Sequence, residues 1–275
     1  MSIKLLGWDT SSKAGAIVAL EWDQPDSEWP DVRLVGEWSL NVDSKHSERL
    51  LWGIHQVLES ARWKLSDVDL FSVGTGPGSF TGLRIGVTTA RTLAHSMSKP
   101  LIGVSSLAAL ARPASLWLAS QKALEATTVI AATDAAKGEL FALWGKAKAV
   151  SRSFAPEYLE GAQKGVREAV MDPSELVAEL VASVAAKSDG YWLAVGEGRH
   201  RYPEAWKKLS EKKRIEPPAP FYDQVQGRYL GMISFEAWKA GFAASPLAVH
   251  PRYLRASDAE VKLKAGLLKP QNFSM

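Results

Sequence analysis

Residue types that could perform chemistry gather where the first apolar stretch of the chain ends. Asp9 directly follows the predicted strand 4–8 and precedes Thr10, Ser11 and Ser12. An aspartate beside hydroxyl groups at the end of a strand can hold a phosphate through Mg²⁺. It can equally accept hydrogen bonds from the backbone of its own turn. The sequence leaves both interpretations of Asp9 open.

A second candidate is the glycine-rich segment 74–82, which lies between a predicted strand over 70–73 and a predicted helix over 83–98. A helix N-terminus exposes N–H groups and binds phosphate, and Ser79 or Thr81 can cap it. The segment matches neither the P-loop nor the Rossmann pattern. A phosphate cradle and a tight turn that packs helix against sheet both stay open. The candidate phosphate- or nucleotide-binding residues are Asp9, Thr10, Gly76, Gly78, Ser79 and Thr81.

Neither a metal site nor a catalytic residue is predicted. The chain has no cysteine, which excludes disulfides and thiolate metal ligands. No pair of histidines has the spacing of a helical metal site, and the nucleophile pattern G-x-S-x-G is absent. Each histidine therefore fits a surface, cap or core role better than a ligand role; they are His46, His55, His95, His200 and His250.

Alternating and apolar stretches predict two similar halves. Before residue 105 we expect strands over 4–8, 14–22, 32–40, 70–73 and 101–104, with helices over 46–60 and 83–98. The apolar stretch before Asp134 resembles the apolar stretch before Asp9. In both places a second predicted strand follows after a turn that contains a glycine. This match predicts a duplicated unit. The second half adds a strand over 191–195 and helices over 173–187 and 224–241.

Two of the predicted helices could meet a partner. In helix 46–60, Leu50, Leu51, Ile54, Val57 and Leu58 form one apolar face, whereas Trp52 lies off that face beside Gly53. Helix 83–98 carries small residues at four-residue spacing, which let another helix approach closely. The candidate interface residues are Leu50, Trp52, Gly53, Gly86, Ala90 and Ala94. The alternative is that both helices are covered within the chain.

Composition limits the class of protein. With 275 residues, 46% of them hydrophobic and 23% charged, the chain can form a substantial core. A net charge of +3 is only mildly basic, without the dense basic stripe of a dedicated nucleic-acid binder. No apolar run approaches the ~20 residues of a membrane span, and Asp9 interrupts any signal-peptide pattern. We expect a cytoplasmic protein that contacts no membrane.

The glycine-rich segment and the residues that follow it closely resemble the TsaB (YeaZ) family. The resemblance implies a non-catalytic relative of TsaD in the biosynthesis of threonylcarbamoyladenosine in tRNA. The resemblance is sharpest over 76–86, which reads GPGSFTGLRIG, and continues through 100–107. Residues 146–190 and those beyond Arg255 match nothing sharply. Further matches lie at 9–11, 46–48, Asp134, 137–139 and 253–255.

The resemblance implies an α/β fold of the two-lobed ASKHA type, the type of actin, sugar kinases and Hsp70. Each lobe would be built on an RNase H-like βββαβα unit. We expect residues 1–105 to form the first lobe, joined by the helix near 224–241. The second lobe would cover 106–260, and 261–275 would be a tail.

The resemblance also implies a scaffold function without catalysis by this chain. It would dimerise with a TsaD-type catalytic subunit through helices 46–60 and 83–98 and activate it, and it could form a homodimer through the same helices. A TsaE-type ATPase would dock on the pair, and tRNA would be the substrate of the complex. The chain would need no cofactor, whereas the complex would use ATP or ADP and Mg²⁺. The alternative is an autonomous ASKHA-type ATP-dependent phosphotransferase that uses Asp9 and the loop 74–82.

Overall fold

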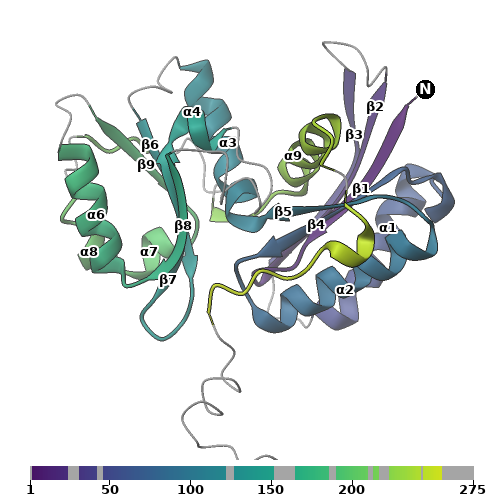
Figure 1. Ribbon diagram of the computed structural model, residues 1–275, viewed down its shortest axis with the longest axis horizontal. Helices are drawn as coiled ribbons and strands as arrows, with labels where there is room; N and C mark the ends of the chain where they lie inside the picture. Colours follow the sequence, from purple (N-terminus) through teal and green to yellow (C-terminus); the bar gives the residue numbers. More distant parts are fainter. Residues whose placement is uncertain are drawn as a thin grey trace, which may run out of the picture.

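The computed structural model describes residues 2–23, 31–41, 46–121, 127–151, 165–185, 190–209, 213–216, 223–242 and 244–255. Within these ranges the chain forms two lobes, each with one β-sheet and its own covering helices (Figure 1). Among the helices of these ranges, none combines the length and the apolar character that crossing a lipid bilayer requires.

The first lobe contains a mixed five-stranded sheet. Strands β1 and β2 and then β2 and β3 pair antiparallel, whereas β4 pairs parallel to β1 and β5 parallel to β4. In spatial order the strands are β3 (Asp31–Asn41), β2 (Ala14–Asp23), β1 (Ile3–Asp9), β4 (Leu70–Gly76) and β5 (Leu101–Ser105).

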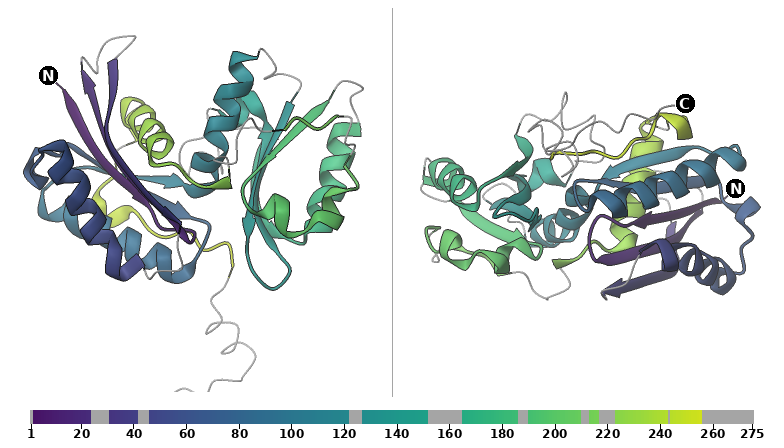
Figure 2. Two further views of the ribbon diagram at one scale, coloured as in Figure 1. Left: turned by 180° about the vertical axis from the view of Figure 1, so that it is seen from behind. Right: turned by 90° about the horizontal axis from the view of Figure 1, so that it is seen from below.

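Helices cover both faces of this sheet. Helices α1 (His46–Ala61) and α2 (Phe80–Ser96) pack on one face, and α9 (Gly227–Lys239) packs on the other (Figure 2, left). Because side chains alternate along a strand, Leu6 lies in the cluster under α1 and α2, whereas Leu5 lies in the cluster under α9. The central strands are therefore apolar on both sides.

The second lobe repeats this pattern with a four-stranded sheet in the described ranges. Strand β6 pairs antiparallel with β7 and parallel with β9, as β1 does with β2 and β4. The spatial order is β8 (Val166–Met171), β7 (Leu140–Lys146), β6 (Thr127–Asp134) and β9 (Tyr191–Val195). The predicted duplication is confirmed by this shared topology.

The helices of the second lobe also lie on two sides of its sheet. The outer face is covered by α6 (Pro173–Ala185) and α8 (Pro203–Trp206), with α7 (Gly198–Arg201) beside them (Figure 1). The inner face is covered by α3 (Ser106–Ser120) and the short α4 (Ala147–Val150).

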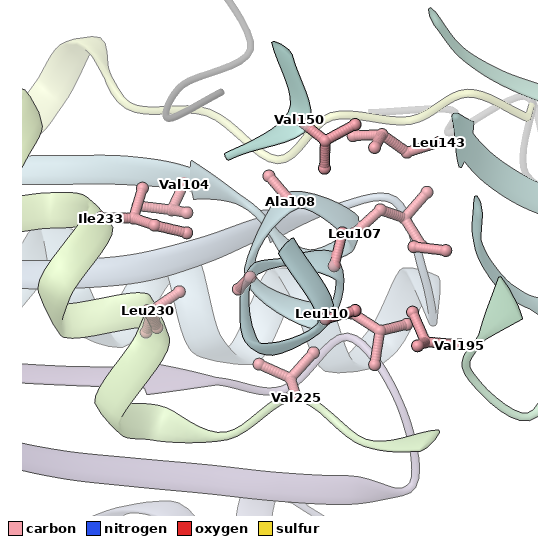
Figure 3. Packing of buried hydrophobic residues seen from close by; sticks show 14 of the residues in the cluster. Val104, Leu107, Ala108, Leu110, Leu143, Val150, Val195, Val225, Leu230 and Ile233 are labelled. Carbon is pink, nitrogen blue, oxygen red and sulfur yellow. The ribbon is translucent and has the colours of Figure 1, made fainter. Parts of the chain in front are cut away.

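Helix α3 forms the junction between the lobes. Its Leu107 and Leu110 belong to one hydrophobic cluster that includes Val104 of β5, Val195 of β9 and Leu230 of α9 (Figure 3). The apolar core is thus continuous from one sheet to the other. Helix α3 begins at the predicted domain boundary 105/106 and packs against elements of both sheets. These contacts do not assign α3 to one lobe, so the boundary stays a prediction.

The C-terminal end of the described chain crosses between the lobes. It passes through the 3₁₀ turn η4 (Pro246–Ala248) beside α2 and then runs toward the second sheet, in yellow in Figure 1. We call residues 249–255 the strap.

Candidate functional site: the cleft between the lobes and the α1–α2 face

A cleft of about 1250 Å³ lies between the two lobes. The first lobe contributes the loops that follow β1 and precede α2. The second lobe contributes the turn after β6 and the residues around α7, and the strap forms a further wall. Clefts between domains are common sites for small ligands.

Asp9 is fully buried and does not line this cleft. Its Oδ1 accepts hydrogen bonds from the backbone N–H of Ser11 at 2.8 Å and from the Ser11 hydroxyl at 2.6 Å. Its Oδ2 accepts a hydrogen bond from the Ser106 hydroxyl at 2.5 Å. A Cβ at Gly74 would overlap the same carboxylate. These contacts support the interpretation of Asp9 as a turn aspartate.

The glycine-rich segment lies directly on the loop that follows Asp9. The Ser79 N–H donates to the Ser11 carbonyl at 2.6 Å, and a Cβ at Gly78 would overlap that carbonyl. The Thr10 hydroxyl donates to the Gly82 carbonyl at 2.7 Å. The glycines therefore serve the close approach of two backbone segments, as the tight-turn interpretation requires.

The start of α2 is fixed by a side-chain cap. The Ser79 hydroxyl accepts the Gly82 N–H at 3.2 Å, so the helix begins at Phe80, three residues earlier than the sequence pattern indicates. Ser79 and Gly78 are the two predicted phosphate-binding residues that line the cleft. Thr10 is buried, Thr81 is exposed, and neither Thr81 nor Gly76 lines the cleft. A nucleotide role for this loop stays a prediction.

Asp134 occupies the equivalent turn of the second lobe. Its Oδ1 accepts the N–H of Ala136, two residues ahead, at 3.0 Å, as Asp9 accepts that of Ser11. The Tyr202 hydroxyl also donates to it, at 3.1 Å. Burial and this carboxylate raise the pKa of Tyr202. The described residues contain no group of three or more His, Asp or Glu that could hold a metal ion.

A charged pair that no sequence signal indicated borders the cleft. Arg199 donates to Asp223 from Nε at 2.7 Å and from Nη2 at 3.0 Å, and His200 Nε2 lies 3.1 Å from the same carboxylate. Burial would raise the pKa of Asp223, but Arg199 and His200 outweigh it and lower that pKa. Asp223 therefore stays ionised at neutral pH and fixes the position of α7.

The α1–α2 face differs from the prediction. Leu50, Gly53, Gly86, Ala90 and Ala94 are buried within the chain, which corrects their assignment to a partner interface. The reason is that a row of small residues lets a helix approach its own sheet as closely as it would approach a second helix. In this chain the row on α2 faces the sheet: Ala90 and Ala94 lie in the hydrophobic cluster under α1 and α2.

Trp52 is the predicted interface residue that lies at the surface. It is 54% exposed, and its ring packs edge-on against Trp38 with centroids 6.1 Å apart. Leu51 was expected on the core face of the helix but is 61% exposed beside it. The predicted apolar face was wrong at Leu51, because the buried side of α1 holds the other four residues of that face and Leu51 lies beyond its edge. Leu51 and Trp52 together form an apolar patch on α1.

The sequence predicted an extended segment over 251–255 within the strap, but it gave no indication of Glu168, the partner of Arg252. Glu168 lies in a region where no motif could be found. Its side chain is 1% exposed, pairs with the Arg252 guanidinium and accepts the Ser105 hydroxyl at 2.6 Å. Burial raises the pKa of the Glu168 carboxyl, and Arg252 and Ser105 offset part of that rise.

Two lobes with duplicated, helix-covered sheets and a cleft between them define an α/β protein of the ASKHA type, as expected. A family model described as "TsaD: tRNA N6-adenosine threonylcarbamoyltransferase" matches residues 41–176. The structure called "YeaZ from Pseudomonas aeruginosa" aligns with a TM-score of 0.66 at 24% identity, covering 92% of this chain and 100% of that one. This likeness concerns the fold.

Relatives that are similar in sequence identify the family more specifically than the fold does. The "tRNA threonylcarbamoyladenosine biosynthesis protein TsaB" of Haemophilus influenzae is 30% identical over 212 residues, covering 76% of this chain and 80% of the relative. The protein of the same name from Escherichia coli is 29% identical over 206 residues, covering 75% and 76%. The chain belongs to the TsaB family.

Proposed function

We propose that this chain takes part in the biosynthesis of threonylcarbamoyladenosine in tRNA as a non-catalytic, cytoplasmic subunit. It would dimerise with a TsaD-type catalytic subunit and activate it. Family membership supports the pathway, because the relatives carry that name. The match of a TsaD family model over 41–176 supports a common fold with the proposed partner.

The observation that carries the non-catalytic role is the state of Asp9. Both carboxylate oxygens accept hydrogen bonds from side chains or backbone of the chain itself, and the residue has no exposed surface. Three hydrogen bonds already occupy this carboxylate, and a Mg²⁺ ion that displaced one of them would leave a buried donor of Ser11 or Ser106 unsatisfied, at a cost of about 1–3 kcal/mol. Nothing in this geometry favours the phosphotransferase alternative.

The partner face we propose is the outer surface of α1 and α2. Leu51 and Trp52 of α1 are exposed apolar residues, and such side chains often provide the main binding energy of interfaces. On α2 the exposed Thr88 and Thr92 are small enough to let a partner helix approach. The patch is small, so the surrounding polar residues of both helices would belong to the interface.

In this proposal the chain needs no cofactor of its own. ATP or ADP and Mg²⁺ act elsewhere in the complex, on the TsaD-type subunit and on a TsaE-type ATPase that docks on the pair. The tRNA is the substrate of the whole complex. A homodimer through α1 and α2 would compete with the heterodimer, because both would use the same face.

Size-exclusion chromatography with light scattering tests the proposal directly. The chain is mixed with a TsaD-type subunit, and we expect a complex with equal numbers of the two proteins. Leu51→Glu should abolish it, whereas Leu116→Glu on α3, which replaces a leucine 38% exposed, should not. Independent elution of the wild-type proteins, with and without nucleotide, would overturn the scaffold function.

The same samples test the phosphotransferase alternative. Purified chain is incubated with Mg-ATP and candidate acceptors, and phosphate transfer is measured against an Asp9→Asn variant. We expect no turnover by either protein. Turnover by the wild-type chain that disappears in Asp9→Asn, with the variant shown to be folded by circular dichroism, would move the conclusion from scaffold to enzyme.

A further inference from the structure

The strap holds the first lobe through its backbone and one ring. The Arg252 N–H donates to the Thr75 carbonyl at 2.8 Å, at the end of β4. The Tyr253 ring packs on Phe80 with centroids 4.7 Å apart, and the Arg84 Nε donates to the Tyr253 hydroxyl at 3.2 Å. Phe80 and Arg84 lie in the first two turns of α2, so the strap touches the start of that helix.

The side chains of the same short segment hold the second lobe. The Arg252 guanidinium pairs with Glu168 of β8. The Arg255 Nη1 donates to the Ala135 carbonyl at 2.7 Å and lies 3.4 Å from Glu139. The strap therefore contacts the first lobe through the Arg252 backbone and the Tyr253 ring, and the second lobe through the guanidinium groups of Arg252 and Arg255.

Glu168 connects three elements at one buried point. It belongs to β8 of the second lobe, accepts the hydroxyl of Ser105 at the end of β5, and pairs with Arg252 of the strap. A buried carboxylate with a guanidinium and a hydroxyl as partners is strongly directional, and removing one partner leaves an uncompensated buried charge. We call Glu168, Ser105 and Arg252 the latch.

A second tie starts from Arg112 of α3 itself. The Arg112 guanidinium pairs with Glu236 of α9 and donates to the carbonyl of Ser151, just after α4. Glu236 packs with the first lobe and Ser151 with the second. The lobes are thus joined by charged contacts at two places, Arg112 and Glu168, in addition to the shared apolar core.

We propose that the latch and the strap hold the two lobes at one fixed angle without a ligand, and that this fixes the start of α2 for the partner. Lobes of a two-lobed protein move by default unless the interface between them is large and hydrophobic. Here the continuous apolar core and the two ties join the lobes through contacts of the chain itself. The link to the partner rests on the proposed function, whereas the fixed angle does not.

The fixed angle can be measured on the chain alone. Because the protein has no cysteine, Ser66→Cys and Glu175→Cys introduce one spin label in each lobe at exposed positions. Double electron–electron resonance should give a narrow distance distribution between the labels. Glu168→Ala should broaden it, whereas Glu179→Ala, which removes the exposed ion pair with Arg167, should leave it narrow.

Two further variants keep the test decisive if Glu168→Ala does not fold. Glu168→Gln retains an acceptor oxygen and should broaden the distribution less than a full truncation. Arg252→Met removes the guanidinium and should broaden it clearly. Unchanged distributions in folded Glu168→Ala or Arg252→Met, or a broad distribution in the wild-type chain, would overturn the latch.

The coupling to the partner needs a separate measurement. Titration with a TsaD-type subunit should show that Arg252→Met raises the heterodimer Kd by about tenfold, within the usual range of coupling between sites. Broad lobe distances with an unchanged Kd would disprove the coupling. Failure of the wild-type heterodimer would instead overturn the proposed function and leave the lobe distances to decide the latch.

Discussion

The Ser106 hydroxyl donates a hydrogen bond of 2.5 Å to Asp9 Oδ2 and thereby joins the end of β1 to the first residue of α3, 97 residues further along the chain. The same hydroxyl accepts the Gly76 N–H at 3.1 Å. The end of β1, the end of β4 and the start of α3 are therefore joined at this point through the Ser106 hydroxyl and the buried carboxylate, which makes Asp9 a structural residue.

Asp9→Ala should lower the free energy of unfolding by about 2–4 kcal/mol, because it leaves buried donors of Ser11 and Ser106 without an acceptor. Urea unfolding followed by circular dichroism measures this. Asp134→Ala is the matched control: it removes the equivalent turn carboxylate at a more exposed site and should cost less. Equal losses would contradict a special structural role for Asp9.

Ala90→Trp should destabilise the whole chain, because Ala90 is fully buried between α2 and the sheet and overpacking a filled core costs about 1–3 kcal/mol or more. Thermal unfolding of the isolated chain is the measurement. Thr88→Trp, on the exposed side of the same helix, should leave the melting temperature nearly unchanged. A native melting temperature for Ala90→Trp would show that the core has room there.

Gly78→Ala should also destabilise the fold, by about 1–3 kcal/mol, because its Cβ would overlap the Ser11 carbonyl and neither backbone can move freely. Gly36→Ala in β3 is the control. Its Cβ would meet Val57 at 3.6 Å, an ordinary contact, so the change should be within about 0.5 kcal/mol. Chemical unfolding of both variants at one temperature gives the comparison, and similar values would refute the close-approach explanation.

The stability should depend on pH through Glu168. Burial raises its pKa in the folded chain, whereas unfolding returns it to about 4.3. Between these two values the folded chain binds more protons, so the free energy of unfolding falls as the pH rises through that window. Glu168→Gln should remove this contribution.

The measurement is the free energy of unfolding of both proteins at a series of pH values upward from 4. The free energy of unfolding of the wild type, minus that of Glu168→Gln, should decrease as the pH rises and then become constant. Glu236→Gln should show a change of the same sign, because burial raises that pKa as well. Parallel curves for wild type and Glu168→Gln would mean that Glu168 titrates normally.

Local patterns predicted most of the elements correctly. The predicted helix over 46–60 is α1 (His46–Ala61), and the predicted strand over 191–195 is β9. These predictions succeed because the buried residues of an element are apolar, so apolar residues recur with the period of the helix or strand that buries them. The repeat that ends in Asp9 and Asp134 also predicted the shared topology, because equivalent turns need equivalent residues.

The candidate site was harder to predict for physical reasons. The small residues of α2 specify close approach but not which surface approaches, so Ala90 could not be assigned to core or interface from spacing. Asp9 has the same neighbours in sequence whether it binds a metal or its own turn. Glu168 acts through Ser105 and Arg252, 63 and 84 residues away, and no local pattern encodes such a contact.

Helix α9 covers one face of the first sheet, although it follows the whole second lobe in the chain. During synthesis on the ribosome, Leu5, Val18 and Leu20 therefore emerge long before the helix that buries them. The N-terminal sheet must remain open to water, or to a chaperone, until translation has passed Lys239. The order of synthesis thus makes the N-terminal lobe the last to be completed.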